Sequence, residues 1–196
     1  EGETADGRSS QKRVCVAQVV TSSPTAPWRN IMQGYVRILL EARRYVYMQT
    51  PYFLPTEPVM VAMRTAALSG IDVRLMLPMQ SDSKILQWAS RSFLPEVMRA
   101  GVKVYYYKPG FLHSKMLVSD DCVCTCGSTN IDFRSFENNF EANIFFYNTE
   151  VSKRMKRIFL DDQRQSDMLN PVARKRRQPF LDRFVQSVFR LFSPLL

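Results

Sequence analysis

The sequence has very few groups that titrate near neutral pH: among its 196 residues there is a single histidine, His113. It also has no run of about 18 apolar residues, so no transmembrane helix is predicted within the chain. Residues 1–13 are polar and lack the apolar stretch of a signal peptide. We interpret them as a polar linker or the edge of a longer chain, and we expect one domain over residues 14–196.

Cysteine is scarce as well. There are four, and three of them follow a C-x-C-x-C pattern: Cys15, Cys122, Cys124 and Cys126. Because the side-chain period of a strand is two, the pattern predicts three sulfurs on one face, packed as small core residues. The spacing differs from the C-x2-C pairs of zinc sites, so we expect no metal. A disulfide framework is not expected either, which favours a reducing compartment.

Acidic residues are fewer than basic ones, 18 against 27, and the formal net charge is +9. Such a charge favours anionic partners, which include phospholipid surfaces, nucleic acid and phosphorylated substrates. Charge alone does not choose among these three. The apolar fraction of 45% is that of an ordinary globular protein rather than a disordered one.

Apolar periodicity predicts alternating strands and helices in the first half of the chain. The expected strands are 14–20, 45–50, 72–78 and 102–107, and the expected helices are 28–44, 57–68 and 81–101, the last with a kink or break at Pro95. Three close strands follow, at 113–119, 122–127 and 140–148, then a helix at 149–166 and an amphipathic helix at 180–192. This order predicts an α/β/α layered domain with a mixed, largely parallel central sheet flanked by helices.

The residues best suited to take part in a reaction lie close in sequence to the single histidine. His113 and Lys115 are two residues apart, so in a strand both side chains leave the same face. A neutral imidazole can attack phosphorus or move a proton, and an ammonium beside it stabilises phosphate oxygens. The turn that follows offers Gly127 for a close backbone approach, and Ser128 and Asn130 as donors to phosphate. Together these groups suit phosphoryl-ester chemistry without a metal.

Each of these residues alone carries little weight, because a lone histidine is more often structural than catalytic. Asp120, followed by Asp121, is on local grounds a turn former. The complete register H-x-K-x4-D-x6-G-S-x-N is more specific, since six residue types stand at fixed offsets.

This register resembles the HKD motif of the phospholipase D superfamily. The segments TPYFLPTEPV, AGVKVYYYKPGFLHSKMLVSDD and GSTNIDFRSFENNFEANIFFYN extend the likeness, and they are similar to the C-terminal half of bacterial cardiolipin synthases. The resemblance implies a phospholipase D-like fold. It also implies transfer of a phosphatidyl group between two phosphatidylglycerols, giving cardiolipin and glycerol through a phosphohistidine, with no cofactor.

The resemblance also implies roles for individual residues. His113 would be the acid/base or the nucleophile, and Lys115, Ser128 and Asn130 would hold the phosphate. Glu141 falls where the superfamily has an acid that orients an imidazole, in two-motif relatives often that of the other half. Asp120 is part of the motif, and we favour structural support for it. Three further polar residues could line a headgroup pocket or cap turns: Arg134, Asn138 and Asn139.

Family members carry two HKD motifs, whereas this chain has one. We therefore expect a part of a longer protein, with a short homologue that dimerises as the alternative. The second motif would come from an N-terminal half or from a second copy. The resemblance places the protein at the bacterial cell membrane through a missing N-terminal part, with phosphatidylglycerol or another anionic phospholipid as partner and nucleic acid not expected. Two alternatives stay open: a dimeric phospholipase D-type hydrolase or nuclease, and a catalytically silent half that binds phosphate or anionic lipid.

Overall fold

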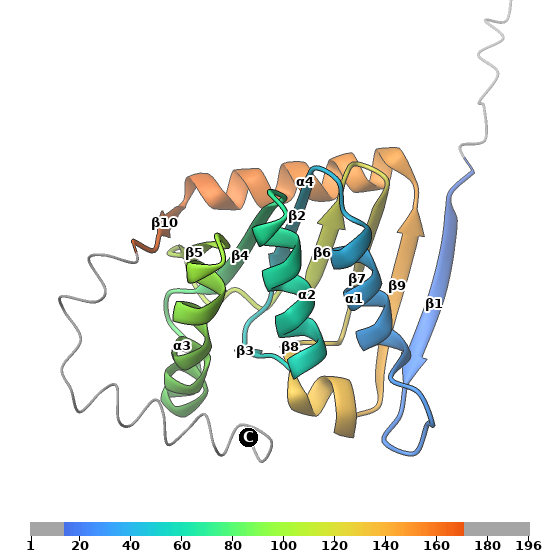
Figure 1. Ribbon diagram of the computed structural model, residues 1–196, viewed down its shortest axis with the longest axis horizontal. Coiled ribbons are helices and arrows are strands. Elements are labelled where there is room, and N and C mark those ends of the chain that lie inside the picture. Colours follow the sequence, from blue (N-terminus) through green and yellow to red (C-terminus); the bar gives the residue numbers. More distant parts are fainter. Residues whose placement is uncertain (1–13, 171–196) are drawn as a thin grey trace, which may run out of the picture.

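The computed structural model describes residues 14–170, so the predicted linker at 1–13 and the predicted helix at 180–192 lie outside the described residues. In order, its strands and helices are β1 (Val16–Ser22), α1 (Asn30–Glu41), β2 (Tyr45–Gln49), β3 (Phe53–Leu54), α2 (Glu57–Leu68), β4 (Asp72–Pro78), α3 (Lys84–Arg99), β5 (Lys103–Tyr107), β6 (Met116–Ser119), β7 (Val123–Gly127), β8 (Ile131–Asp132), the short π-helix η1 (Arg134–Asn138), β9 (Glu141–Tyr147), α4 (Thr149–Arg164) and β10 (Ser166–Met168). Strands and helices largely alternate from β1 to β5, and β5 to β8 are four successive strands (Figure 1).

Eight of these strands form one sheet in the order β1-β9-β7-β6-β2-β4-β5-β10, and β3 and β8 form a small second sheet. The mixed character of the main sheet is confirmed. Parallel pairing is confined to β2, β4 and β5, which are joined by helical crossovers, and the five other pairings are antiparallel. Parallel pairing is thus less extensive than expected. Strands β6 and β7 are joined by a short turn, which permits only antiparallel pairing, and β9, β1 and β10 also pair antiparallel with their neighbours.

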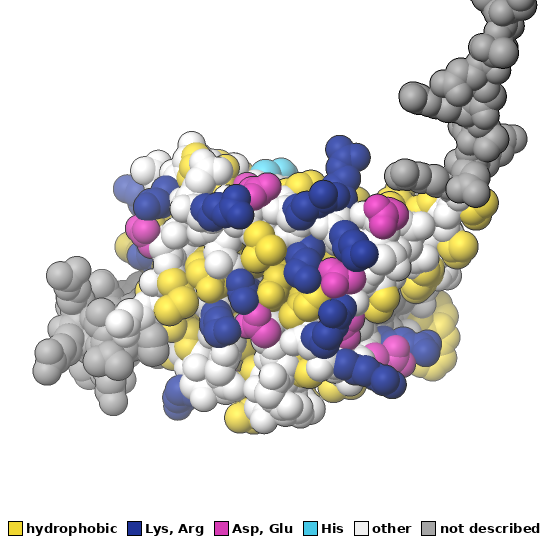
Figure 2. Space-filling view, turned by 90° about the horizontal axis from the view of Figure 1, so that it is seen from above, with side chains coloured by type: hydrophobic (Ala, Val, Ile, Leu, Met, Phe, Trp, Pro, Cys, Tyr) yellow, Lys and Arg dark blue, Asp and Glu magenta, His cyan; other side chains and the backbone are white. Residues whose placement is uncertain are grey.

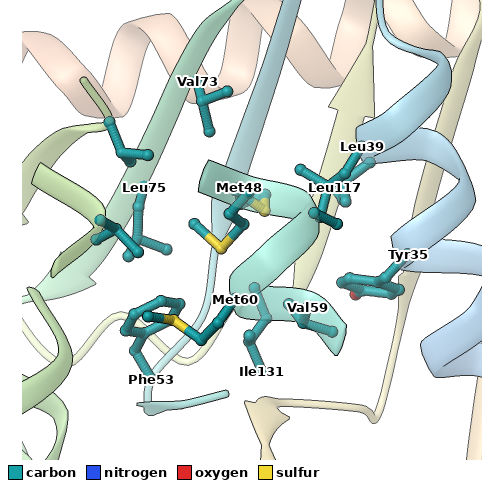
Figure 3. Close-up of a cluster of buried hydrophobic side chains, with 14 of the residues drawn as sticks. Tyr35, Leu39, Met48, Phe53, Val59, Met60, Val73, Leu75, Leu117 and Ile131 are labelled. Carbon is teal, nitrogen blue, oxygen red and sulfur yellow. The ribbon is translucent and has the colours of Figure 1, made fainter. Parts of the chain in front are cut away.

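Helices cover both faces of the main sheet, as the layered prediction requires. Helices α1, α2 and α3 lie on one face, while α4 crosses strands β9, β7, β6, β2 and β5 on the other (Figure 1). The larger core lies under α1–α3, where Tyr35, Met48, Phe53 and Leu75 are buried (Figure 3). Each apolar side chain buried there stabilises the fold by about 1.5–3 kcal/mol. The smaller core lies under α4 and centres on Phe159.

Three local expectations differ from the structure. Strand β6 begins at Met116, so His113 and Lys115 precede the strand rather than lie within it. Cys124 is buried, but Cys122 is exposed, because the turn before β7 interrupts the period of two. Helix α3 continues through Pro95 without a break. All four cysteines are free thiols.

None of the helices within residues 14–170 has both the length and the apolar character that a membrane span needs.

Candidate active site

The segment that carries His113 runs in extended form from a Pro-Gly turn into β6. Its side chains alternate, so that Leu112 and Met116 are buried in the core beneath α4 while His113 is exposed between them. The buried pair fixes the segment to the sheet and presents the imidazole at the edge. The Phe111 ring lies 5.4 Å from the imidazole, and the Tyr52 ring lies 6.4 Å from Phe111, which gives the site an aromatic side wall.

His113 and Lys115 meet, as the two-residue spacing predicts. The Lys115 Nζ lies 3.1 Å from His113 Nε2 and 3.0 Å from the His113 carbonyl oxygen. Because an ammonium group only donates hydrogen bonds, this contact fits an imidazole whose lone pair is on Nε2. Burial lowers the pKa of Lys115, while the nearby charges of Glu141 and Asp132 act to raise it. An anionic phosphate group would stabilise the same ammonium and compensate for its desolvation.

The antiparallel register carries the GSTN turn to the same edge. Met116 pairs with Cys126, so the chain places Lys115 opposite Gly127, immediately before Ser128. Gly127 in turn pairs with Asn143 on β9, and the Ser128 amide donates to the carbonyl oxygen of Ala142 at 3.0 Å. Three strand ends therefore converge on one edge of the sheet.

Glu141 lies at this edge and is held by hydrogen bonds. It accepts from the Ser128 hydroxyl and from the Asn139 carboxamide, the latter at 3.3 Å. The Ser128 hydroxyl also accepts from the Ala142 amide at 3.1 Å. The Glu141 side chain is therefore half-buried, and each of its two carboxylate oxygens accepts a hydrogen bond.

Asn143, which no sequence motif singled out, supports the GSTN turn through hydrogen bonds. Its buried carboxamide oxygen accepts from the Thr129 amide at 3.3 Å, and its nitrogen reaches the hydroxyls of Thr125 and Tyr35. The same carboxamide packs against Gly127, where a Cβ would lie 2.3 Å from its oxygen and 2.2 Å from the Ala142 carbonyl oxygen. Glycine at 127 is thus required by the close approach of β7 to β9.

Asp132 is a second residue missed by the sequence analysis. Its carboxyl group accepts the Ser135 amide at 2.7 Å, which caps η1, and it is hydrogen-bonded to the Asn130 side chain. Burial raises the pKa of Asp132, and the charge of Glu141 adds to this effect, while the hydrogen bonds oppose it. In the sequence, only the position of Asp132 two residues after the GSTN turn could have indicated its place near the site.

Asp120 is the one predicted site residue that lies elsewhere. Lys115 precedes β6 and Asp120 follows it, so the two residues lie at opposite ends of this strand. At the usual rise per residue they are roughly 15 Å apart. Its carboxylate accepts the backbone amides of Arg43, Arg44 and Tyr45 at 2.7–2.9 Å, where β2 begins. Its φ of 55° is the left-handed conformation that aspartate tolerates in turns. This geometry is that of structural support.

Among the polar residues near the GSTN turn, Arg134 and Asn139 line an open pocket beside Asn130. Asn138 ends η1 and is exposed. No group of three or more His, Cys, Asp or Glu side chains within the described part of the chain is arranged to hold a metal ion. The donors gathered at the edge are an imidazole, an ammonium, a hydroxyl and carboxamides, a set that fits an anionic phosphate ester better than a cation.

Comparison with solved structures identifies the class of fold. The chain resembles a phosphatidylserine synthase from Haemophilus influenzae, with a TM-score of 0.76 over 93% of this chain and 48% of that one at 13% identity. It also resembles Nuc from Salmonella typhimurium, a phospholipase D family member, with a TM-score of 0.67 over 80% of this chain and 99% of that one at 16% identity. The fold is therefore phospholipase D-like.

Sequence comparison then identifies the family. The family model described as cardiolipin synthase, PLD-like domain, matches residues 35–163. The chain is 42% identical over 180 residues to a cardiolipin synthase of Clostridium perfringens, and 44% identical over 179 residues to one of Geobacillus thermodenitrificans. The chain belongs to the PLD-like domain family of cardiolipin synthases. It covers 38% and 36% of the length of these two relatives, and they cover 92% and 91% of this chain.

The position of Asp120 predicts that its substitution affects stability rather than the site. Asp120→Asn should lower the free energy of unfolding by about 1–3 kcal/mol, because its amide group presents a donor to backbone amides that need acceptors. The NMR signals of the His113 ring should stay unchanged. Denaturant unfolding measures the first effect, with Asp161→Asn as a control that alters only an exposed i,i+3 pair. A fully stable Asp120→Asn protein with shifted His113 signals would show that Asp120 acts on the site.

Gly127 and Gly110 form a matched pair for testing the close approach of β7 to β9. Gly127→Ala should destabilise the protein by about 3 kcal/mol, because the new methyl group meets backbone that cannot move alone. Gly110→Ala should change stability by less than about 0.5 kcal/mol, since open space surrounds that position. Equal melting temperatures for the two variants would contradict the close approach.

Proposed function

We propose that this chain is one catalytic part of a cardiolipin synthase. It would transfer a phosphatidyl group between two phosphatidylglycerols, giving cardiolipin and glycerol. The observation that carries this proposal is the contact of His113 with Lys115 at an edge that also holds Ser128, Asn130 and Glu141, in a chain of this family.

The chemistry would proceed in two displacements on phosphorus. In the first, the lone pair of one histidine attacks phosphorus while the bond to the leaving glycerol oxygen breaks, and a second histidine protonates that oxygen. In the second, the incoming hydroxyl loses its proton to the second histidine, and its oxygen attacks the phosphorus of the phosphohistidine. The P–N bond breaks and the first histidine is released. By resemblance His113 more often takes the acid/base role, in which its Nε2 would exchange the hydrogen bond from Lys115 for the proton that it transfers.

Lys115 and Asn130 would hold the phosphoryl oxygens in both steps, and Ser128 would join them by turning its hydroxyl proton from Glu141 to the phosphate. An ammonium and neutral donors placed where negative charge develops stabilise such a transition state without a metal. The site is partly desolvated, which strengthens each of these interactions. Glu141, held by Ser128 and Asn139, would orient an imidazole brought from outside this chain, since its own partners already fix its position.

The mechanism requires a second histidine on the opposite side of the phosphate, and this chain has one. One imidazole cannot act as nucleophile and as acid in the same step. The second HKD motif would come from the part of the relatives that this chain does not cover, or from a second copy related by a two-fold axis. The exposed position of His113 leaves it accessible to such a partner.

An anionic membrane is the proposed environment of the substrate. The net charge of +9 favours anionic lipid, and Figure 2 shows Lys and Arg side chains over much of one face, with fewer acidic ones between them. A nuclease or hydrolase of the same fold would use the same charge and the same site, so the acceptor molecule must be determined by assay.

The assay supplies the second motif in trans. As a monomer, this chain should make little cardiolipin from phosphatidylglycerol vesicles. When mixed with the N-terminal part of the Geobacillus thermodenitrificans relative, it should release glycerol and cardiolipin in equal amounts. His113→Asn should abolish this turnover, and EDTA should leave it intact because lysine takes the place of a metal ion.

Three results would contradict the proposal in different ways. Release of phosphatidic acid without cardiolipin would indicate a hydrolase, and digestion of DNA would indicate a nuclease. A preparation that sediments as a monomer and makes cardiolipin at a normal rate, dependent on His113, would overturn the need for two histidines. Gly110→Ala serves as the control variant that should retain full turnover.

A further inference from the structure

A pocket of about 180 Å3 opens beside the predicted phosphate ligands. Its walls come from the segment between β2 and β3, from the first turn of α3, and from β8 with η1. Tyr52 and Leu86 line one side, and Asn130, Asp132 and Asn139 line the other. A volume of this size holds about six water-sized groups. Because Asn130 belongs both to the proposed phosphate site and to the pocket wall, a group esterified to the bound phosphate has this pocket beside it.

We propose that this pocket is a subsite for a small polyol carried on the phosphate, with the carboxyl group of Asp132 as its main hydrogen-bonding group. This inference rests on the proposed function, in which both the leaving and the incoming alcohol are glycerol derivatives. It assigns selection of the headgroup to residues outside the HKD motif.

The polar groups of the pocket suit neighbouring hydroxyls. A hydroxyl both donates and accepts, and a carboxyl group offers two oxygens that accept. Burial raises the pKa of Asp132, and its bonds from Ser135 and Asn130 hold the carboxyl group in place. Asn139 donates through its nitrogen to Glu141 at 3.3 Å, which leaves its carbonyl oxygen as the acceptor end of the amide.

The opposite wall is also fixed. The Tyr52 hydroxyl donates to both carboxylate oxygens of Asp82 at 2.8 Å, so its own oxygen can accept from a ligand hydroxyl. Leu54, Leu86 and Phe133 provide an apolar surface for the CH groups of a polyol. The walls thus combine an apolar surface with several fixed polar groups, which is the combination that a polyol with CH and OH groups requires.

A headgroup with an ammonium ion fits the pocket less well. The Asp132 carboxyl group already accepts from the Ser135 amide and is hydrogen-bonded to the Asn130 side chain, so part of its accepting capacity is used. Arg134 also lines the pocket and contributes a positive charge. The balance therefore favours a neutral polyol over an amine.

The test measures binding of three phosphate monoesters to this chain: methyl phosphate, glycerol phosphate and phosphoethanolamine. The chain has a single histidine, so the NMR signals of the His113 ring report occupancy of the phosphate site directly. Glycerol phosphate should bind about fivefold more tightly than methyl phosphate, the gain expected of one or two net hydrogen bonds. Phosphoethanolamine should bind no better than methyl phosphate.

Two variants locate the effect. Asp132→Asn keeps an oxygen that can cap η1, and Leu86→Phe fills the pocket from the side of α3; each should reduce the fivefold ratio to between one and two. Leu68→Phe, on an exposed side chain at the end of α2, should keep the ratio. Melting curves check that the variants are folded.

The outcomes separate the subsite from the phosphate site. Equal affinity for methyl phosphate and glycerol phosphate would overturn the polyol subsite while leaving the phosphate site intact. Tighter binding of phosphoethanolamine would overturn it in favour of a cationic headgroup. Failure of all three esters to shift the His113 signals would overturn the phosphate site of the proposed function, and the subsite with it.

Discussion

The candidate site depends on the close approach of β7 to β9 at Gly127. No side chain fits there, because the Ala142 carbonyl group and the Asn143 carboxamide occupy the place where a Cβ would lie. The approach allows Ser128 to bond to both Ala142 and Glu141, and allows Asn143 to hold the Thr129 amide. Since β6 pairs with the other side of β7, Lys115 and His113 reach the same edge. Loosening this approach would separate the two parts of the site.

The ends of β6 have different tasks, although the HKD motif joins them in the sequence. At one end His113 and Lys115 face solvent, where a phosphate group can be bound. At the other end the Asp120 carboxylate accepts hydrogen bonds from three backbone amides and so fixes the start of β2. Because β2 and β6 are neighbours, this clamp sets the register in which Met116 pairs with Gln49. Asp120 would therefore serve the site through the sheet rather than through contact with substrate.

Much of this arrangement could be predicted from the sequence. Apolar periodicity located the main strands and helices, and the two-residue spacing of His113 and Lys115 predicted their contact. The short strands β3, β8 and β10 were missed because two or three residues carry no period. Cys122 was placed wrongly because two consecutive residues with left-handed backbone, Asp120 and Asp121, shift the register before β7.

The supporting residues of the site were harder to predict for a different reason. Asn143 lies in a strand of largely apolar and exposed positions, and its importance comes from Thr129 and Gly127, which reach it only through strand pairing. The surroundings of Asp132 are formed by η1 and Asn130, and no sequence pattern predicts a five-residue π-helix. Such residues depend on contacts between distant segments, which a single sequence does not display.

The central claim is that His113, Lys115, Ser128 and Asn130 form one phosphate site. A crystal structure of this chain grown with tungstate, an anion of similar shape that is easily located by its scattering, tests it most directly. The account predicts one tungstate at the sheet edge, within hydrogen-bonding distance of His113 Nε2 and Lys115 Nζ and in contact with Ser128 and Asn130. Tungstate bound only to surface Lys and Arg side chains, with this edge empty, would contradict it.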